Sequence, residues 1–194
     1  MTRRPCTFLA LGLTALLLIG CGEKAKKLED MTKAERAAAV PFAGRDEKEV
    51  LSAFPDDTRD VLEQASSVTL FTLNPHRLVD GVLSPEPERF HNYGVLDKVD
   101  VTDVGEHRRL VEAVYEGLLA EGAGPAQCFI PRHGVRFVLG SQSVDVLICF
   151  ECTWVHVFRD GAKHETRLLF SAGVKPVFDS LVQAHALKQD GDPK

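Results

Sequence analysis

The sequence predicts an α+β fold, in which an antiparallel β-meander packs with an amphipathic central helix and a C-terminal helix, after short N-terminal helices. Three observations predict this class. Short alternating segments follow one another closely between residues 127 and 170, with turn residues between them, which is typical of consecutive hairpins. A stripe of apolar residues at helical spacing precedes these segments, and a second helical pattern follows them. Helices set apart from an antiparallel sheet define the α+β class.

Residues 32–66 predict a region of short helices. Side chains that favour helix N-caps stand where each helix would begin: Thr32, Asp46, and Asp56 or Asp57. Thr32 also lies three residues before Glu35, the spacing of a capping box, and Pro41 ends that first helix.

Strands are predicted wherever apolar residues alternate or β-branched and aromatic residues cluster. These segments span residues 67–73, 93–101, 127–130, 135–139, 144–150, 153–159 and 165–170. Turn residues at 140–143 and 160–161 join the last four of them into two hairpins. We therefore expect one α+β domain over residues 67–188 and a disordered tail over 189–194.

Two helices should cover this sheet. Asp103 and Glu106 have the spacing of a capping box, and a long amphipathic helix follows them. Its apolar stripe is formed by Leu110, Val111, Val114, Tyr115, Leu118 and Leu119. The C-terminal helix, predicted over residues 176–188, has Phe178, Leu181 and Val182 to pack on the sheet.

The first twenty residues read as an export signal. Arg3 and Arg4 precede an apolar run over residues 6–19, which is short for a membrane-spanning helix and suits a signal peptide. The run ends in Leu18-Ile19-Gly20-Cys21, which resembles the lipobox of bacterial lipoproteins.

The lipoprotein resemblance implies a fate for each part of the N-terminus. Residues 1–20 would be a signal peptide cut off before Cys21, and the Cys21 thiol would carry a diacylglycerol. Residues 21–31 would be the lipid anchor and a charged tether. The protein would then be held at the bacterial cell envelope, on the outer or the inner membrane, with its domain in the periplasm or at the cell surface. Lipid on Cys21 makes the membrane itself the first expected partner.

The charge balance argues against nucleic acid as a partner. The whole chain has 23 basic and 28 acidic residues, a formal charge of −5. Loss of residues 1–20 would remove two arginines and leave −7. Phosphate binding needs a basic surface, which this composition does not favour.

Three of the five cysteines would remain as thiols after export, because Cys6 leaves with the signal and Cys21 is lipidated. Exported proteins live in an oxidising compartment, so we expect one disulfide and one spare thiol. Folding the hairpin at residues 140–143 favours a Cys128–Cys152 pairing over a Cys128–Cys149 pairing. The alternative is three buried reduced cysteines that act as small apolar side chains.

A zinc site is a sharper hypothesis for the same region. Cys128, His133, Cys149 and Cys152 form a Cys3His set with one Cys-x-x-Cys pair, the ligand types that zinc prefers. Strand geometry opposes it, because residues three apart on a regular strand point to opposite faces. Coordination would need a bend at Phe150-Glu151, where neither glycine nor proline marks one.

Two catalytic interpretations compete with the zinc site. A thiol–disulfide enzyme would place its Cys-x-x-Cys motif at a helix N-terminus, but this motif lies among strand-forming residues. A cysteine nucleophile would need a base and an orienting acid. The residues available for those roles are His133 or His156 with Asp145 or Glu151.

Plainer interpretations account for the same residues. Residues 131–134, Pro-Arg-His-Gly, read as a turn that exposes Arg132 and His133. His156 alternates with aromatic neighbours and would fill part of a sheet face. Residues 128–134 and 148–152 together resemble segments of uncharacterised exported bacterial proteins, a group that implies no activity.

Two functional hypotheses follow from the sequence. The first is a membrane-anchored lipoprotein whose α+β domain is a binding or structural module for an unknown envelope protein. The second is a metal- or thiol-dependent site on Cys128, His133, Cys149 and Cys152, with zinc or a redox role.

Overall fold

The computed structural model describes residues 30–32, 54, 56–75, 87–119 and 128–191. The lipobox residues 18–21 and the helices expected near Thr32 and Asp46 lie outside the described residues, apart from Thr32 and Phe54 themselves. The described elements, in chain order, are α3 (Asp56–Gln64), β1 (Ser67–Asn74), β2 (Arg89–Phe90), β3 (Tyr93–Asp100), α4 (Val104–Leu119), β4 (His133–Leu139), β5 (Gln142–Cys149), β6 (Trp154–Arg159), β7 (Ala162–Leu169), η2 (Ala172–Val174) and α5 (Lys175–Ala184).

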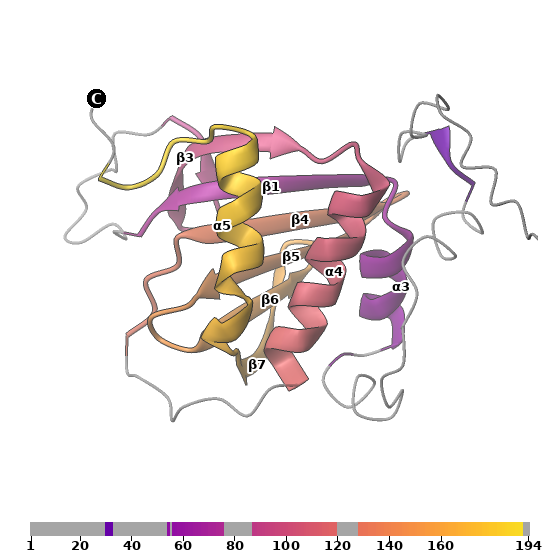
Figure 1. Ribbon diagram of the computed structural model, residues 1–194. Helices are drawn as coiled ribbons and strands as arrows, with labels where there is room; N and C mark the ends of the chain where they lie inside the picture. The colour runs from indigo at the N-terminus through magenta and orange to yellow at the C-terminus, as the bar shows by residue number, and fades with distance from the viewer. Residues whose placement is uncertain (1–29, 33–53, 55, 76–86, 120–127, 192–194) are drawn as a thin grey trace, which may run out of the picture.

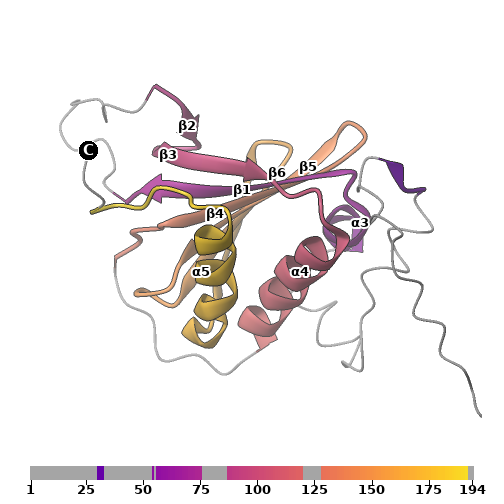
Figure 2. The same ribbon diagram turned by 45° about the horizontal axis from the view of Figure 1, so that its top comes forward.

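The α+β class predicted from the sequence is confirmed. Seven antiparallel strands form one sheet in the order β2-β3-β1-β4-β5-β6-β7, and β4 to β7 are the expected meander. The helices α3, α4 and α5 lie on one face of this sheet, with α4 and α5 side by side (Figures 1 and 2). Residues 128–130, expected to be a strand, are not in one.

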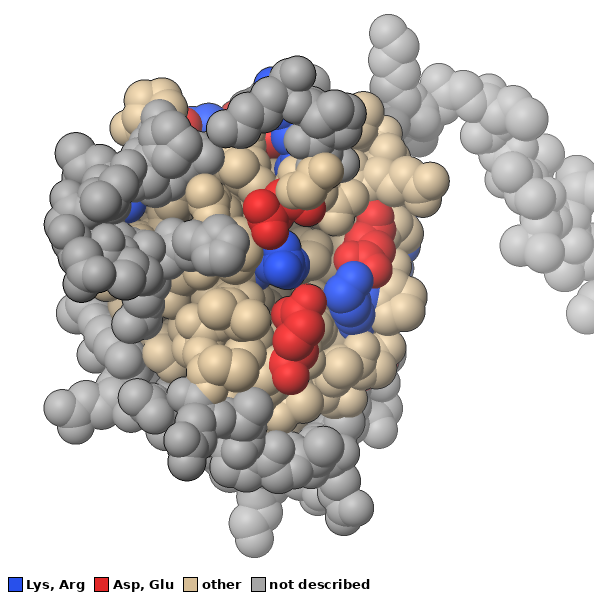
Figure 3. All heavy atoms as spheres, turned by 90° about the vertical axis from the view of Figure 1, so that its left-hand side faces the viewer, with Lys and Arg blue, Asp and Glu red and all other residues tan. Residues whose placement is uncertain are grey.

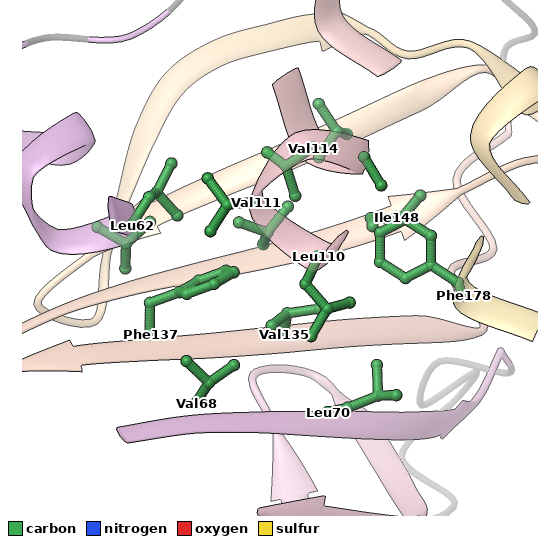
Figure 4. Packing of buried hydrophobic residues seen from close by; sticks show 14 of the residues in the cluster. Leu62, Val68, Leu70, Leu110, Val111, Val114, Val135, Phe137, Ile148 and Phe178 are labelled. Carbon is green, nitrogen blue, oxygen red and sulfur yellow. The ribbon is translucent and has the colours of Figure 1, made fainter. Parts of the chain in front are cut away.

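The main core lies between the sheet and the three helices (Figure 4). Alternation along each strand sends every second side chain to this face, as Val144, Val146 and Ile148 of β5 illustrate. The stripe of α4 supplies Leu110, Val111, Val114 and Tyr115, and Phe178, Leu181 and Val182 come from α5. The apolar positions expected of both helices are therefore the ones that α4 and α5 bury.

A second, smaller core lies on the opposite face of the sheet. Its buried members are Phe71, Leu73, Phe90, Tyr93, Val95 and Leu147, with Phe129 and Phe158 packed against them. The turn between β2 and β3 lies over this face, where the Phe90 ring stacks on Phe71 with 4.3 Å between centroids. Both faces of the sheet thus carry buried apolar groups, which fixes the register of the central strands.

Candidate functional site

The β5–β6 connection brings two cysteines together. β5 ends at Cys149, and residues 150–153 form a turn in which Thr153 takes a left-handed backbone conformation with φ of 53°. A disulfide joins Cys149 to Cys152, and the backbone N–H of Cys152 also donates to the Cys149 sulfur at 3.1 Å. The regular strand that would separate these residues onto opposite faces is therefore absent, because the strand stops and the chain turns between them.

Cys128 completes a group of three sulfurs. Its Sγ atom lies 3.2 Å from Sγ of Cys152, although the bridge itself is between Cys149 and Cys152. The sequence favoured the pairing of Cys128 with Cys152, and the structure differs from that interpretation. The reason is that Cys149 and Cys152 are three residues apart and the turn alone brings them together, whereas Cys128 comes from a separate segment. Cys128 remains an exposed free thiol.

Several contacts hold the segment that carries Cys128 against the sheet. The Phe129 ring stacks on the His156 ring with 3.8 Å between centroids and nearly parallel planes. The Tyr93 hydroxyl donates to the Phe129 carbonyl at 3.3 Å. The backbone N–H of Leu73 donates to the Arg132 carbonyl at 2.9 Å. These contacts fix the approach of Cys128 to the β5–β6 turn.

An ion pair ties the same two segments together. The Arg132 guanidinium lies 3.5 Å from the Glu151 carboxylate, and Arg132 also pairs with Asp190. Asp190 belongs to the stretch expected to be a disordered tail. Figure 3 views the end of the molecule where β5 finishes, and acidic and basic side chains lie next to one another on its described part. Both partners of the Arg132–Glu151 pair are partly exposed, so this contact contributes orientation more than stability.

His133, the fourth residue of the predicted zinc set, lies elsewhere. It begins β4 and is 3% exposed, so the turn and exposed histidine expected at residues 131–134 are wrong for His133 and Gly134, which lie in buried strand, whereas the Arg132 side chain is partly exposed. Its ring packs against Phe150 and Phe178 on the helix-covered face, whereas Cys149 alternates with Ile148 and Phe150 and lies on the other face.

The zinc set is thus only partly assembled. Three of its members meet and His133 does not, and within the described residues no group of three or more His, Cys, Asp or Glu side chains is arranged to hold a metal. Zinc binding stays a prediction from the sequence.

Burial gives His133 an unusual titration. Desolvation lowers the pKa of its imidazole to about 4, and the nearby Asp179 carboxylate, 3.7 Å away, only partly opposes this. Neither ring nitrogen has a hydrogen-bond partner among the described residues. His133 is therefore a neutral core side chain at physiological pH.

We expect this histidine to make the fold sensitive to mild acid. Well above pH 6.5 the imidazole is neutral in both the folded and the unfolded chain, so it does not change the free energy of unfolding. Between pH 6.5 and 4 the imidazole is protonated in the unfolded chain but stays neutral in the folded chain. The free energy of unfolding therefore falls by up to roughly 3 kcal/mol as the pH is lowered through this range. Urea unfolding across this range should show the loss in the wild type. His133→Phe should remove it, and an unchanged slope in that variant would contradict the assignment.

One of the acids considered for a cysteine nucleophile, Asp145, is engaged elsewhere. The buried Asp145 carboxylate accepts two hydrogen bonds from Arg136, from Nε and Nη2 at 2.7 Å each, and lies 2.8 Å from His91 Nε2. Burial alone would raise the pKa of Asp145, but the bonds from Arg136 and His91 outweigh it and lower that pKa. Asp145 is therefore a buried carboxylate anchored within a hydrogen-bonded cluster.

Sequence reasoning missed this cluster of Arg136, Asp145 and His91, although half of it was detectable. Arg136 and Asp145 are direct cross-strand partners in the β4–β5 hairpin, and opposite charges at such positions pair favourably. A two-residue turn at Gly140-Ser141 gives that register, whereas counting outward from the predicted four-residue turn at 140–143 would place Arg136 opposite Leu147. His91 had no such signal, since it reaches Asp145 from a turn 54 residues away in sequence and stacks on Phe158.

The described helices include none that is both long and apolar enough to cross a membrane. Comparisons with protein-family models, with curated proteins and with solved structures found no match for this chain.

Proposed function

We propose that this chain is a lipid-anchored lipoprotein of the bacterial cell envelope, whose α+β domain serves as a binding or structural module. The observation that carries the proposal is Leu18-Ile19-Gly20-Cys21 at the end of a short apolar run preceded by Arg3 and Arg4. Each buried lipid methylene contributes about 0.8 kcal/mol, so a diacylglycerol on Cys21 would hold the chain at a membrane without a spanning helix.

Two features of the described domain support a binding or structural role. The charged segment that follows Cys21 leads to a domain whose described core lies on both faces of one sheet. The buried carboxylate of Asp145 is occupied by Arg136 and His91, which is the arrangement of a structural ion pair. These features suit a domain presented to another envelope component.

Lipid labelling tests the anchor directly. In cells fed a labelled fatty acid, the wild-type chain should incorporate label and be shortened by removal of residues 1–20. Cys21→Ser should accumulate as an unlabelled, full-length precursor, because the acceptor thiol is gone. Cys6→Ser is the matched control: it removes a cysteine from the segment proposed to be cut off and should be labelled and processed normally. Normal labelling and processing of Cys21→Ser would refute the lipoprotein proposal.

The second candidate function is a metal- or thiol-dependent site on Cys128, His133, Cys149 and Cys152. The proximity of Cys128 to the Cys149–Cys152 bridge favours its thiol form. The zinc form is tested by metal analysis of the purified chain after reduction and incubation with zinc. About one zinc per chain, lost in a Cys149→Ser variant, is the result that supports it. Absence of bound zinc from the reduced chain would contradict it.

A further inference from the structure

Exposure divides the three sulfurs into a buried pair and one accessible member. Cys149 and Cys152 are both 0% exposed, whereas Cys128 is exposed. An outside reagent therefore meets Cys128 before it meets the disulfide. We propose that these three cysteines form a thiol–disulfide exchange site. Cys128 exchanges with the buried Cys149–Cys152 disulfide, and the resulting bridge to Cys128 is accessible at the surface to a thiol of an exported polypeptide.

The first step is internal and conserves electrons. The Cys128 thiolate attacks Sγ of Cys152, its neighbour at 3.2 Å, and a bond forms between these two sulfurs as the Cys149–Cys152 bond breaks. Cys149 leaves with the electron pair of the broken bond and takes up the proton that Cys128 released. One disulfide and one thiol are present before and after, so no outside oxidant or reductant is needed.

The second step involves the partner. A partner thiolate attacks the exposed Sγ of Cys128, forms a mixed disulfide with it, and releases Cys152 as a thiolate. A second partner thiol then attacks the partner's sulfur in that mixed disulfide and releases Cys128. Two partner thiols have become one disulfide, and the protein disulfide has taken up the two electrons and two protons. Cys152 is the shared member of both protein bridges.

The surroundings of the cluster position Cys128 for this exchange. The stack of Phe129 on His156 and the Arg132–Glu151 ion pair join the segment that follows Cys128 to residues on either side of Cys152. A thiol held by its neighbours loses less orientational freedom on reaching Cys152 than one on a free chain, which favours the internal step.

Apolar side chains near the cluster indicate the kind of partner. Among the described residues, the exposed large apolar side chains are Ile130 and Leu169. Ile130 lies two residues after Cys128. Leu169 is the cross-strand partner of Trp154, which in turn is the cross-strand partner of Cys149. A polypeptide thiol flanked by apolar residues can contact these side chains, whereas a small hydrophilic thiol such as glutathione cannot cover them. The proposed envelope location matters to the inference only as the place where such partners occur.

Reduction kinetics of the purified, oxidised full chain in detergent test the exchange. The probe is a peptide with one cysteine between leucines, and acid quenching, alkylation and mass spectrometry count the reduced cysteines. The wild-type disulfide should be reduced about tenfold faster than that of a chain whose Cys128 has first been alkylated in the folded state, because direct attack on the buried sulfurs is hindered. Cys128→Ser should behave like the alkylated chain.

Equal or faster reduction of the alkylated chain would overturn the proposal. That chain has the native sequence and is modified after folding, so the result does not depend on whether Cys128→Ser folds. Glutathione serves as the second probe and should react more slowly than the leucine-flanked peptide; equal rates would overturn the polypeptide assignment. Failure of lipid labelling at Cys21 is a separate result, which leaves these rates unchanged.

Discussion

Replacement of Phe178 by alanine is expected to lower the free energy of unfolding by about 3–5 kcal/mol. Phe178 is 0% exposed, and its ring meets those of Phe150 and His133 at centroid distances of 5.4 and 6.0 Å. Truncation removes the largest buried side chain of α5 and leaves a cavity between this helix and the sheet. Urea unfolding followed by circular dichroism measures the loss.

The neighbouring Val177 provides the control for Phe178. It lies on the same helix but is only partly buried at the edge of the core. Val177→Ala should cost about 1 kcal/mol or less, since fewer buried methyl groups are lost. If Phe178→Ala were no more destabilising than Val177→Ala, the packing of α5 on the sheet through Phe178 would be contradicted.

Removal of the Arg136 guanidinium should also lower the free energy of unfolding, although by less than Phe178→Ala does. Arg136→Ala leaves the Asp145 carboxylate, 1% exposed, without the two hydrogen bonds that offset its burial. Because the Arg136 side chain is 43% exposed and His91 stays beside Asp145, losing these charge-assisted hydrogen bonds should cost about 2–3 kcal/mol. The variant should also raise the pKa of Asp145, because the bonds that lower it are lost. Chemical denaturation near neutral pH and NMR titration of the carboxylate measure the two effects.

An exposed ion pair offers the matched comparison. Lys98 and Glu88 lie 2.6 Å apart, with both side chains 48% exposed. Lys98→Ala removes a cation from the same sheet without stranding a buried charge, so it should cost less than about 1 kcal/mol. Equal losses in Arg136→Ala and Lys98→Ala would show that Asp145 does not depend on its partner.

The meander and its helices were predictable because they rest on local signals. Alternation placed the strands that became β4 to β7, and the turns fell at Gly140 and at Asp160-Gly161, all of which take positive φ. The helical stripe likewise located α4. The position of β1 between β3 and β4 was not predictable in this way. Periodicity tells which face of a strand is buried but not which strand lies beside it.

The site was harder to predict, because two of its features conflict with local rules. Gly134 suggested a turn, yet it lies within β4, where an added Cβ would come within 2.6 Å of the Phe90 ring. That ring reaches it from a distant segment, so the reason for the glycine is not local. The turn after Cys149 lacks glycine and proline, and Thr153 takes the left-handed conformation instead. The bend that brings Cys149 to Cys152 therefore had no visible marker in the sequence.

Mapping the disulfide-linked peptides is the most direct test of the three-sulfur cluster. The chain should be alkylated in acid, digested and analysed without reduction. Cys152 should take part in every bridge: Cys149–Cys152 in the wild type, and Cys128–Cys152 in a Cys149→Ser variant, because Cys128 lies within reach of the freed sulfur. A free Cys128 in oxidised Cys149→Ser, or a Cys128–Cys149 bridge in the wild type, would contradict the account.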